Sequence, residues 1–464
     1  MKLTINTLSV ILILASAEPL VGQTFERTYG GSDEDCGSSV SQTVDGGYVV
    51  AGYTGSFGPS FDVYLVKTDA SGDTIWTRTF GGASDDRAYS VAQTADDGYV
   101  VAGYTASFGA GFDVYLVKTD ASGDTIWTRT YGGVSGDFGY GVAQTVDGGF
   151  VIVGNTQSFG VGSDDIYLVK TDASGDTMWT RTFGGTDSDR GLSVVQAADS
   201  GYVITGCTRS SGAGNYDVWL IKTDASGDTF WTRTYGGSGD DEGLSVKQAA
   251  DGGYIIVGIT ESFGAGDYDV WLIKTDASGD TMWTRTFGSV SVDVGRSVSS
   301  TADGGYIIAG ETESFGAGWT DVWLIKTDAS GDTIWTRTYG GTDSDEGRSG
   351  VQTADGGYAV TGLTESLGAG DYDVWLIKTD ASGLVAVAEP EPPVAHKPLG
   401  ATIVRAVLFL PEAPGGLLDI SGQEVLDLRA GANDVSRLSP GVYFVREAQA
   451  QAQAQAVRKV VIAR

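Results

Sequence analysis

The sequence contains a single histidine, His396, among its 464 residues, and that residue lies outside the repeated part of the chain described below. A Ser-His-Asp or Cys-His arrangement therefore cannot form within the repeats, and neither can a histidine-ligated metal site. The chain also has no Walker phosphate loop, no glycine-rich loop that opens a helix and no EF-hand pattern. The enzymatic chemistry that remains is a pair of carboxylates, as in glycoside hydrolysis.

Cysteine is almost as scarce, with only two residues in the chain. Cys36 and Cys207 fall in different repeats, the first expected in a loop and the second in a strand. We therefore expect no disulfide framework, and two thiols without histidine make a poor metal site.

Long apolar runs are also missing beyond the N-terminus. Residues 8–15 are apolar, they follow Lys2, and Ala15-Ser16-Ala17 is a small-x-small cleavage pattern. The sequence predicts a signal peptide over residues 1–22, cleaved after Ala17 or after Gly22. Neither this run nor any later one is long enough to span a bilayer, so we expect a protein that leaves the cytoplasm without a membrane span.

Positive charge is in short supply, because 29 Lys and Arg face 60 Asp and Glu, which gives a net charge of −31. The last 65 residues carry seven basic and six acidic residues, so nearly all of the acidity lies before residue 400. Such a field repels nucleic acid and anionic lipid, whereas cations, sugars and basic surfaces remain open as partners. Solubility of an exported protein also explains the charge.

Glycine and aromatic residues, by contrast, are abundant: 70 Gly, 11 Trp and 21 Tyr. The tripeptide Lys-Thr-Asp recurs at intervals of 51 residues once and 52 residues five times, which marks seven near-identical repeats. It begins at Lys67, Lys118, Lys170, Lys222, Lys274, Lys326 and Lys378.

Each repeat has four strand patterns separated by turn residues. In the fifth repeat these patterns cover residues 244–249, 254–260, 270–275 and 281–287. Four-stranded antiparallel units repeated in this way are typical of propeller blades, so the sequence predicts an all-β, seven-bladed β-propeller over residues 23–388. A β-helix has shorter coils, and an open array of sandwiches would need end caps.

The two ends of the repeat region also predict how the ring closes. Six repeats end in Trp-Thr-Arg-Thr, but the seventh runs instead into residues 384–387, Leu-Val-Ala-Val. The missing outer strand is found at residues 23–29, which have no blade before them. We expect this N-terminal strand to complete the seventh blade, which removes an aggregation-prone edge and gives a monomer.

The turn before each Trp carries a resemblance. Residues 68–76, Thr-Asp-Ala-Ser-Gly-Asp-Thr-Ile-Trp, are similar to the Asp-box of sialidase-type blades and to the tryptophan-docking segment of quinoprotein dehydrogenases. The spacing differs by one residue from each family, so the resemblance implies only that the Trp packs between blades. The series that begins with Tyr64 and ends with Trp375 is expected to pack in the same way.

The C-terminal part has a different composition. Residues 389–399 begin Glu-Pro-Glu-Pro-Pro and predict a stiff linker. The β-rich segments 417–425, 431–435, 438–445 and 458–462 then resemble the C-terminal sorting domain of the type IX secretion system, the Por secretion tail family. This resemblance implies, for residues 400–464, a small β-sandwich-like domain that engages the type IX machinery and directs the protein to the cell surface or medium. A plain sandwich used for adhesion is the alternative.

One Asp in each repeat is predicted to lie in the loop that leads to the innermost strand, at the channel mouth. The ring of carboxylates could bind a cation such as Ca²⁺ or polar groups of a glycan. Alternatively, each Asp could accept backbone N–H bonds and fix its own loop. The residues are Asp35, Asp86, Asp137, Asp189, Asp241, Asp293 and Asp345.

Residues that break the repeat are separate candidates for ligand binding. Trp319 takes the place of Asp267 in a loop, where it could stack on a sugar or contact a protein. Arg296 and Arg348 replace Leu or Tyr near the start of the innermost strand and place positive charge at an acidic mouth. Drift among repeats would explain all three residues as well.

Three functions follow as hypotheses. The first is a non-catalytic surface or extracellular propeller that binds a glycan or protein or acts as a scaffold, without any cofactor. The second is a polysaccharide hydrolase or lyase that uses carboxylates at the channel mouth. The third is a structural surface protein that depends on Ca²⁺. The fold alone does not choose among them.

Overall fold

The computed structural model describes residues 23–385 and, in the C-terminal region, residues 402–404, 407–410, 415–418, 423–429, 431–435, 438–439, 441–447 and 457–462. The chain divides into two compact units, and the boundary falls between Ala386 and Val387. The described residues form strands and turns, and no helix among them is long and apolar enough to cross a membrane. The predicted signal peptide and the predicted linker at residues 389–399 lie outside the described residues.

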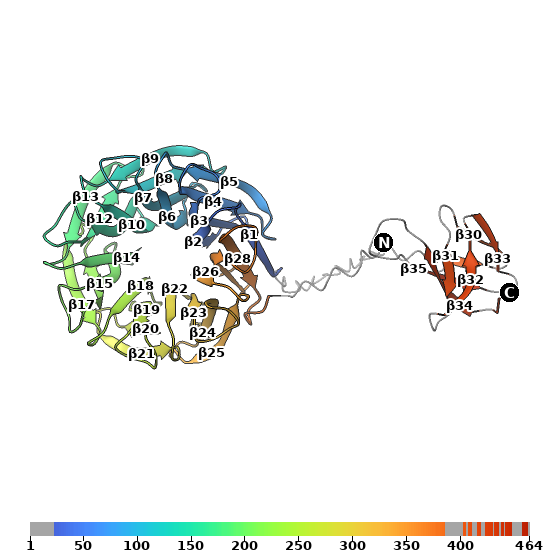
Figure 1. Ribbon diagram of the computed structural model, residues 1–464. Coiled ribbons are helices and arrows are strands. Elements are labelled where there is room, and N and C mark those ends of the chain that lie inside the picture. Colours follow the sequence, from blue (N-terminus) through green and yellow to red (C-terminus); the bar gives the residue numbers. More distant parts are fainter. Residues whose placement is uncertain are drawn as a thin grey trace, which may run out of the picture. The chain divides into compact units, whose positions relative to one another are not determined.

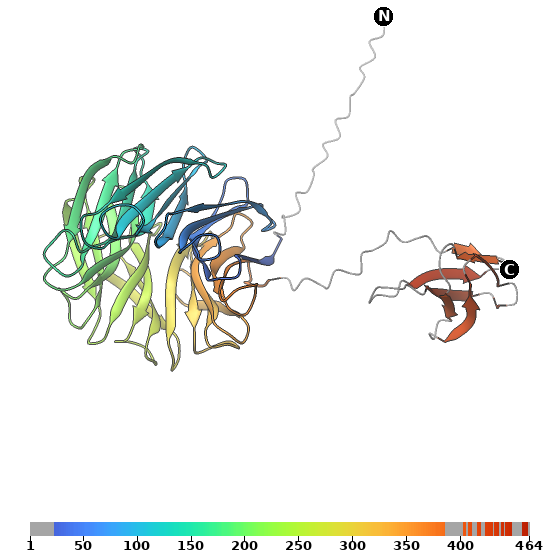
Figure 2. The ribbon, with the colours of Figure 1, turned by 45° about the horizontal axis from the view of Figure 1, so that its top comes forward.

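The first unit is a ring of seven four-stranded antiparallel sheets, as predicted (Figures 1 and 2). The innermost strands are β2 (Asp35–Gln42), β6 (Asp86–Gln93), β10 (Asp137–Gln144), β14 (Asp189–Gln196), β18 (Asp241–Gln248), β22 (Asp293–Ser300) and β26 (Asp345–Gln352). The second strands are β3 (Tyr48–Thr54), β7 (Tyr99–Thr105), β11 (Phe150–Thr156), β15 (Tyr202–Thr208), β19 (Tyr254–Thr260), β23 (Tyr306–Thr312) and β27 (Tyr358–Thr364).

The outer half of each blade is equally regular. The third strands are β4 (Asp62–Thr68), β8 (Asp113–Thr119), β12 (Asp165–Thr171), β16 (Asp217–Thr223), β20 (Asp269–Thr275), β24 (Asp321–Thr327) and β28 (Asp373–Thr379). The outermost strands are β5 (Thr74–Phe80), β9 (Thr125–Tyr131), β13 (Thr177–Phe183), β17 (Thr229–Tyr235), β21 (Thr281–Phe287), β25 (Thr333–Tyr339) and β1 (Phe25–Tyr29).

The innermost strand begins earlier than the sequence pattern predicted. In the fifth blade it starts at Asp241 rather than at residue 244, because Asp241 already pairs with Thr260 of β19. A β-bulge between Gly243 and Ser245 interrupts the hydrophobic alternation, so the sequence pattern did not extend to the first three residues of the strand. Cys36 was likewise expected in a loop, but it lies inside β2, where it pairs with Tyr53.

The N-terminal strand closes the ring, as predicted. β1 pairs antiparallel with β28, in a register that runs from Phe25 opposite Lys378 to Tyr29 opposite Val374. The hydroxyl of Tyr29 also donates a 2.7 Å hydrogen bond to the carbonyl of Gly72 in the first blade. The first seven described residues therefore connect the last blade to the first.

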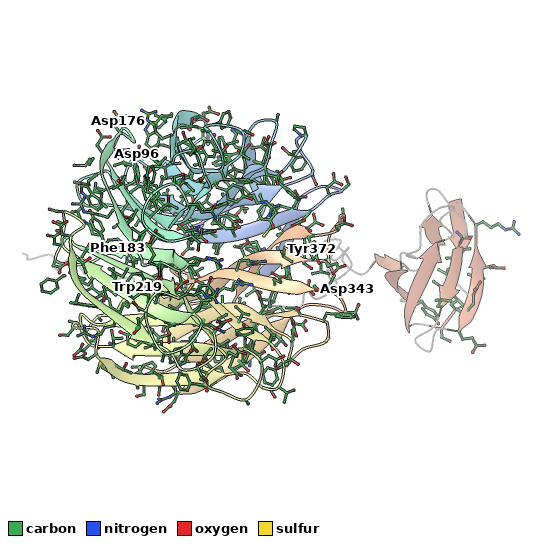
Figure 3. All side chains as sticks on the ribbon, turned by 60° about the vertical axis from the view of Figure 1, so that its left-hand side comes forward. Asp96, Asp176, Phe183, Trp219, Asp343 and Tyr372 are labelled. Carbon is green, nitrogen blue, oxygen red and sulfur yellow. The ribbon has the colours of Figure 1, made fainter. Side chains whose placement is uncertain are left out.

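Side chains fill the spaces between neighbouring sheets (Figure 3). The second and third strands are buried along nearly their whole length. The indole of Trp76 in β5 packs edge-on against Tyr99 of the next blade, with ring centroids 5.7 Å apart. The packing role implied by the Asp-box resemblance is thus present, although Trp76 itself is only partly buried.

The turn that precedes this Trp is held by its first aspartate. Oδ1 of Asp69 accepts hydrogen bonds from the backbone N–H groups of Ser71 (2.8 Å) and Asp73 (3.0 Å). Gly72 supplies the positive φ of 79° that the turn requires. The hairpin between the third and outermost strands is therefore an Asp-stabilised turn.

The described residues of the second unit form seven short strands: β29 (Thr402–Val404), β30 (Val407–Leu410), β31 (Gly415–Leu418), β32 (Glu424–Leu428), β33 (Gly431–Asp434), β34 (Gly441–Glu447) and β35 (Val457–Ile462). They form a five-stranded sheet in the order β29-β35-β34-β31-β32 and a two-stranded sheet of β30 and β33. Leu417, Leu428 and Val435 form a small buried cluster in this unit.

Candidate functional site

The aspartate at the start of each innermost strand is fully buried and accepts hydrogen bonds from two loops of its own blade. Oδ2 of Asp241 accepts a 2.8 Å bond from the backbone N–H of Gly237 and a 2.6 Å bond from the hydroxyl of Ser262. The same two bonds recur in every blade, at 2.7–3.0 Å from the backbone and 2.6–2.7 Å from the serine. This arrangement is the one expected if Asp35, Asp86, Asp137, Asp189, Asp241, Asp293 and Asp345 fix their loops.

A second aspartate, at the start of each third strand, caps the loop between the second and third strands. Oδ2 of Asp269 accepts the N–H groups of Ala265 (2.7 Å) and Gly266 (3.1 Å). Burial and the nearby carboxylate of Asp137 raise the pKa of Asp113, and the hydrogen bonds from the backbone of Ala110 and Gly111 offset this only in part. These carboxylates repeat around the ring, so they provide no single distinctive pair for hydrolysis. No group of three or more His, Cys, Asp or Glu in the described part of the chain is placed to hold a metal ion.

The variable feature of the ring is the bulge in the innermost strand. Each such strand carries a bulge between its third and fifth residues, and the bulged fourth residue is Ser, Tyr, Leu or Arg, depending on the blade. The fifth residue, by contrast, is Ser in six blades and Gly in the third. The seven bulged residues are Ser38, Tyr89, Tyr140, Leu192, Leu244, Arg296 and Arg348.

These seven residues surround one cavity of about 440 Å³. Cys36, Tyr53 and Arg87 complete its lining. Because all seven innermost strands contribute, the cavity lies on the axis of the ring, and we call it the central cavity. Arg296 and Arg348, singled out by the sequence, both line it; the aspartates discussed above do not.

The second and third blades form an aromatic wall of the central cavity. The rings of Tyr89 and Tyr140 meet edge to face, with centroids 5.2 Å apart. Behind them, Phe138 packs against Tyr104 at 5.2 Å and stacks on Phe112 at 5.5 Å. Burial, opposed by the nearby guanidinium of Arg190, raises the pKa of Tyr140 to about 12, so its hydroxyl remains protonated at neutral pH.

The sixth and seventh blades form a charged wall. Nε of Arg296 donates to Oε2 of Glu311 at 3.0 Å, and Nη2 donates to Oε1 at 2.5 Å. Arg348 forms an ion pair with Glu346 through Nη2, while its Nε is buried and has no hydrogen-bond partner. The two guanidinium groups are thus oriented by carboxylates but keep unused N–H donors.

Arg87 also lines the central cavity, although the sequence pattern did not predict this. Its guanidinium carbon lies 4.4 Å from the ring centroid of Tyr53 and 4.3 Å from that of Phe61. Its Nε is also buried without a hydrogen-bond partner. Variation among the repeats could have identified Arg87, because the second residue of the innermost strand differs in nearly every repeat. The strand, however, was predicted to begin after this residue.

Trp319 lies elsewhere. Its side chain is 81% exposed on the loop before β24, and it does not line the central cavity. The structure therefore separates this candidate from Arg296 and Arg348.

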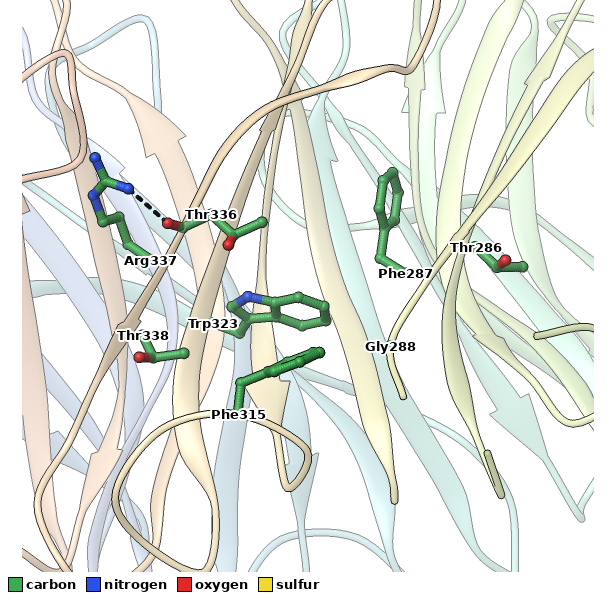
Figure 4. A pocket seen from close by; sticks show the side chains of 8 residues that line it. All are labelled: Thr286, Phe287, Gly288, Phe315, Trp323, Thr336, Arg337 and Thr338. Atoms are coloured by element: carbon green, nitrogen blue, oxygen red, sulfur yellow. Dashed lines mark hydrogen bonds between the residues drawn. The ribbon is translucent and has the colours of Figure 1, made fainter. Parts of the chain in front are cut away.

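A second cavity, of about 450 Å³, lies at the boundary of the fifth and sixth blades (Figure 4). Phe315 packs on Trp323 there, with centroids 5.2 Å apart, and Arg337 donates to the carbonyl of Thr336 at 2.8 Å. The Phe–Trp contact has counterparts in other blades, such as Phe263 with Trp271 at 5.1 Å. This cavity reflects the repeated packing, whereas the central cavity is where the blades differ.

Comparisons with known proteins give few clues. No family model matches the chain. Over 308 residues it is 26% identical to the regulatory protein FlaEY of Caulobacter vibrioides, a match that covers 54% of this chain and 32% of that protein. The chain thus spans about a third of that relative's length.

Solved structures with a similar backbone are more distant in sequence. One is the extracellular domain of a putative one-component system from B. thetaiotaomicron, with a TM-score of 0.42 and 12% identity, covering 94% of this chain and 60% of that one. Another is the WD40 domain of Pan2 from Neurospora crassa, with a TM-score of 0.47 and 9% identity, covering 76% of this chain and 91% of that one.

Proposed function

We propose that the protein is a non-catalytic binding propeller that acts outside the cytoplasm and holds its ligand in the central cavity. One observation carries the proposal. The blades have nearly identical third and outermost strands, yet the seven bulged residues that line this cavity range from Ser through Leu and Tyr to Arg. A purely structural ring would have no need to vary the very position that faces the axis.

The size and lining of the cavity support the same function. About 440 Å³ is within the usual range for small-molecule sites, and such sites combine apolar walls with a few oriented polar groups. Here the tyrosines and leucines provide the apolar part, and the arginines and Tyr hydroxyls provide the polar part. A glycan or an exposed protein segment would fit this chemistry.

The test is to fill the cavity with a side chain that the same backbone already carries. Ser38→Tyr places in the first blade the residue found at the equivalent bulge of the second and third blades, Tyr89 and Tyr140. The full chain and this variant are applied to the same glycan and peptide arrays, with hydrolysis read on the same plates. We expect binding by the wild type, its loss in the variant, equal melting temperatures and no turnover. Ligands that bind both proteins equally would place the site elsewhere.

We also propose that the C-terminal unit is a type IX secretion sorting domain and that residues 1–22 are a signal peptide. The strands over residues 402–462 and the resemblance of their sequence support the first part. In a host with a type IX system, deletion of residues 400–464 should leave the propeller in the periplasm. Export of the truncated chain to the surface or medium would contradict this assignment.

A further inference from the structure

We propose that the ligand of the central cavity is an acidic sugar, a pyranose ring with a carboxylate group that the cavity arginines bind. This inference rests on the proposed function and specifies its ligand class. It is carried by three guanidinium groups and an aromatic wall that line the same cavity.

Arg87, Arg296 and Arg348 all line one cavity in a chain with a net charge of −31. None of the ion pairs in the described part of the chain involves Arg87, which instead contacts the rings of Tyr53 and Phe61. The Nε atoms of Arg87 and Arg348 are buried without a hydrogen-bond partner. A buried N–H group without an acceptor lowers the free energy of unfolding, and a carboxylate oxygen is a suitable acceptor for it.

The carboxylates already present orient the arginines without using all of their donors. A guanidinium group has five N–H bonds, and Glu311 accepts from only Nε and Nη2 of Arg296. The donors that remain can form a two-pronged contact with a ligand carboxylate. Glu311 and Glu346 pair with Arg296 and Arg348 respectively, so of the three lining arginines only Arg87 has no carboxylate partner among the ion pairs of the described residues.

The other side of the cavity favours a sugar over a simple anion. Tyr89 and Tyr140 present ring surface and protonated hydroxyls, and Leu192 and Leu244 lie in the two blades between these tyrosines and the pair Arg296 and Arg348. A sugar ring has an apolar face that packs on aromatic surface and hydroxyls that bond to Tyr and Arg. The central cavity therefore offers apolar surface on one side and guanidinium groups on another, within the space of one sugar-sized ligand.

The probes are disaccharides of glucuronic, galacturonic and mannuronic acid, each paired with its methyl ester. Binding to the full chain is measured by isothermal titration calorimetry at low and high salt. We expect at least one acid to bind, its ester to bind at least ten-fold more weakly, and the difference to shrink as salt rises. The ester keeps the ring and loses only the charge.

The chain supplies its own matched variants. The pair Arg296→Leu with Glu311→Ile reproduces Leu244 and Ile259 of the fifth blade, and it leaves no carboxylate unpaired. Arg348→Leu likewise gives the seventh blade the fifth blade's bulge residue. We expect each to weaken binding of the acid at least ten-fold and that of the ester far less. The control Arg209→Gln removes an exposed positive charge outside the cavity, as Gln157 does in the third blade, and should leave binding unchanged.

The outcomes separate this inference from the proposed function. If acid and ester bind equally and Ser38→Tyr abolishes both, the ligand needs no carboxylate, and this inference is wrong while the proposed binding in the central cavity stands. If none of the three acids binds but Ser38→Tyr still abolishes binding of a ligand from the arrays, the central cavity binds a ligand that is not an acidic sugar, and only this inference is wrong. Loss of acid binding in Arg209→Gln equal to that in Arg348→Leu would show a general charge effect and overturn the inference. If no ligand on any array is sensitive to Ser38→Tyr, both proposals fail.

Discussion

Phe25 and Lys378 stand opposite each other in the antiparallel register that joins the first strand of the propeller to its last blade. Phe25 is buried and packs edge-on against Tyr48 of the first blade, with centroids 5.9 Å apart. Deletion of residues 23–29 should therefore expose the edge of β28, lower the melting temperature and promote oligomers. Thermal melts and light scattering measure both effects.

The same deletion has an internal control. A synthetic peptide of residues 23–31 supplied in trans restores the missing strand without restoring the covalent link. It should recover part of the lost melting temperature and reduce the oligomers. A truncated chain that stays monomeric and melts like the wild type would refute this closure.

Much of the fold could be predicted from the sequence because the chain contains seven copies of the same strand and turn pattern. Turn residues and hydrophobic patterns that are weak in one repeat became clear by agreement among copies, and the incomplete seventh copy pointed to Phe25–Tyr29 as the closing strand. The buried lysines could not be predicted in this way. Lys274 lies in an apolar strand, yet its ammonium pairs with Asp251 at 2.7 Å and donates to the carbonyl of Thr275 at 2.8 Å.

The candidate site was harder to predict than the fold. Arg296 and Arg348 were identified because they depart from their repeats, but the central cavity depends on a bulge that shifts one residue toward the axis. A bulge has no reliable signature in a single strand. Arg87 was missed for the same reason, and the exposed Trp319 was equally conspicuous in the sequence although it lies outside the cavity.

The buried aspartates should act alike in every blade. Asp86→Ala and Asp241→Ala each remove the acceptor of one backbone N–H and one serine hydroxyl. We expect each to cost about 1–3 kcal/mol of unfolding free energy in denaturant titrations. Binding at the central cavity should persist while the variants stay folded. If one of them lost binding with an unchanged melt, that aspartate would belong to the site.

The two aromatic series should differ in their contribution to stability. Trp375 is fully buried between blades, and Trp375→Ala should cost roughly 3–5 kcal/mol of unfolding free energy. Trp335 is only partly buried against the same cluster, so Trp335→Ala should cost less. Trp375→Tyr is the control, because Tyr64 occupies the equivalent place in the first blade. Equal losses in the two Ala variants would show that burial does not govern this packing.

Calcium should have no effect on the stability of the propeller. The aspartates that begin the innermost strands already accept hydrogen bonds from loop residues of their own blade, as Asp241 does from Gly237 and Ser262. We expect the same melting temperature in excess Ca²⁺ and in excess chelator. A rise of several degrees with Ca²⁺ would revive the calcium-dependent hypothesis.

Acid should weaken the propeller through the aspartates that pair with the buried lysines. The hydrogen bond from Lys274 lowers the pKa of Asp251. For Asp303, burial opposes ionisation, but hydrogen bonds from Thr301, Lys326 and Gly305 outweigh it and lower the pKa to about 2. A carboxyl whose pKa is lower in the folded state adds stability above its unfolded pKa of about 4, and this stability is lost as the pH falls toward 2.

Denaturant titrations at pH 5, 4, 3 and 2 measure this loss. The raised pKa values of Asp62 and Asp113 act in the opposite sense, but seven lysine-paired aspartates have lowered values. The net unfolding free energy should therefore fall between pH 4 and pH 2. The paired change Lys274→Met with Asp251→Asn removes one such contact and should make the decline shallower. A wild type equally stable at pH 4 and pH 2 would mean that these ion pairs do not hold the hairpins together.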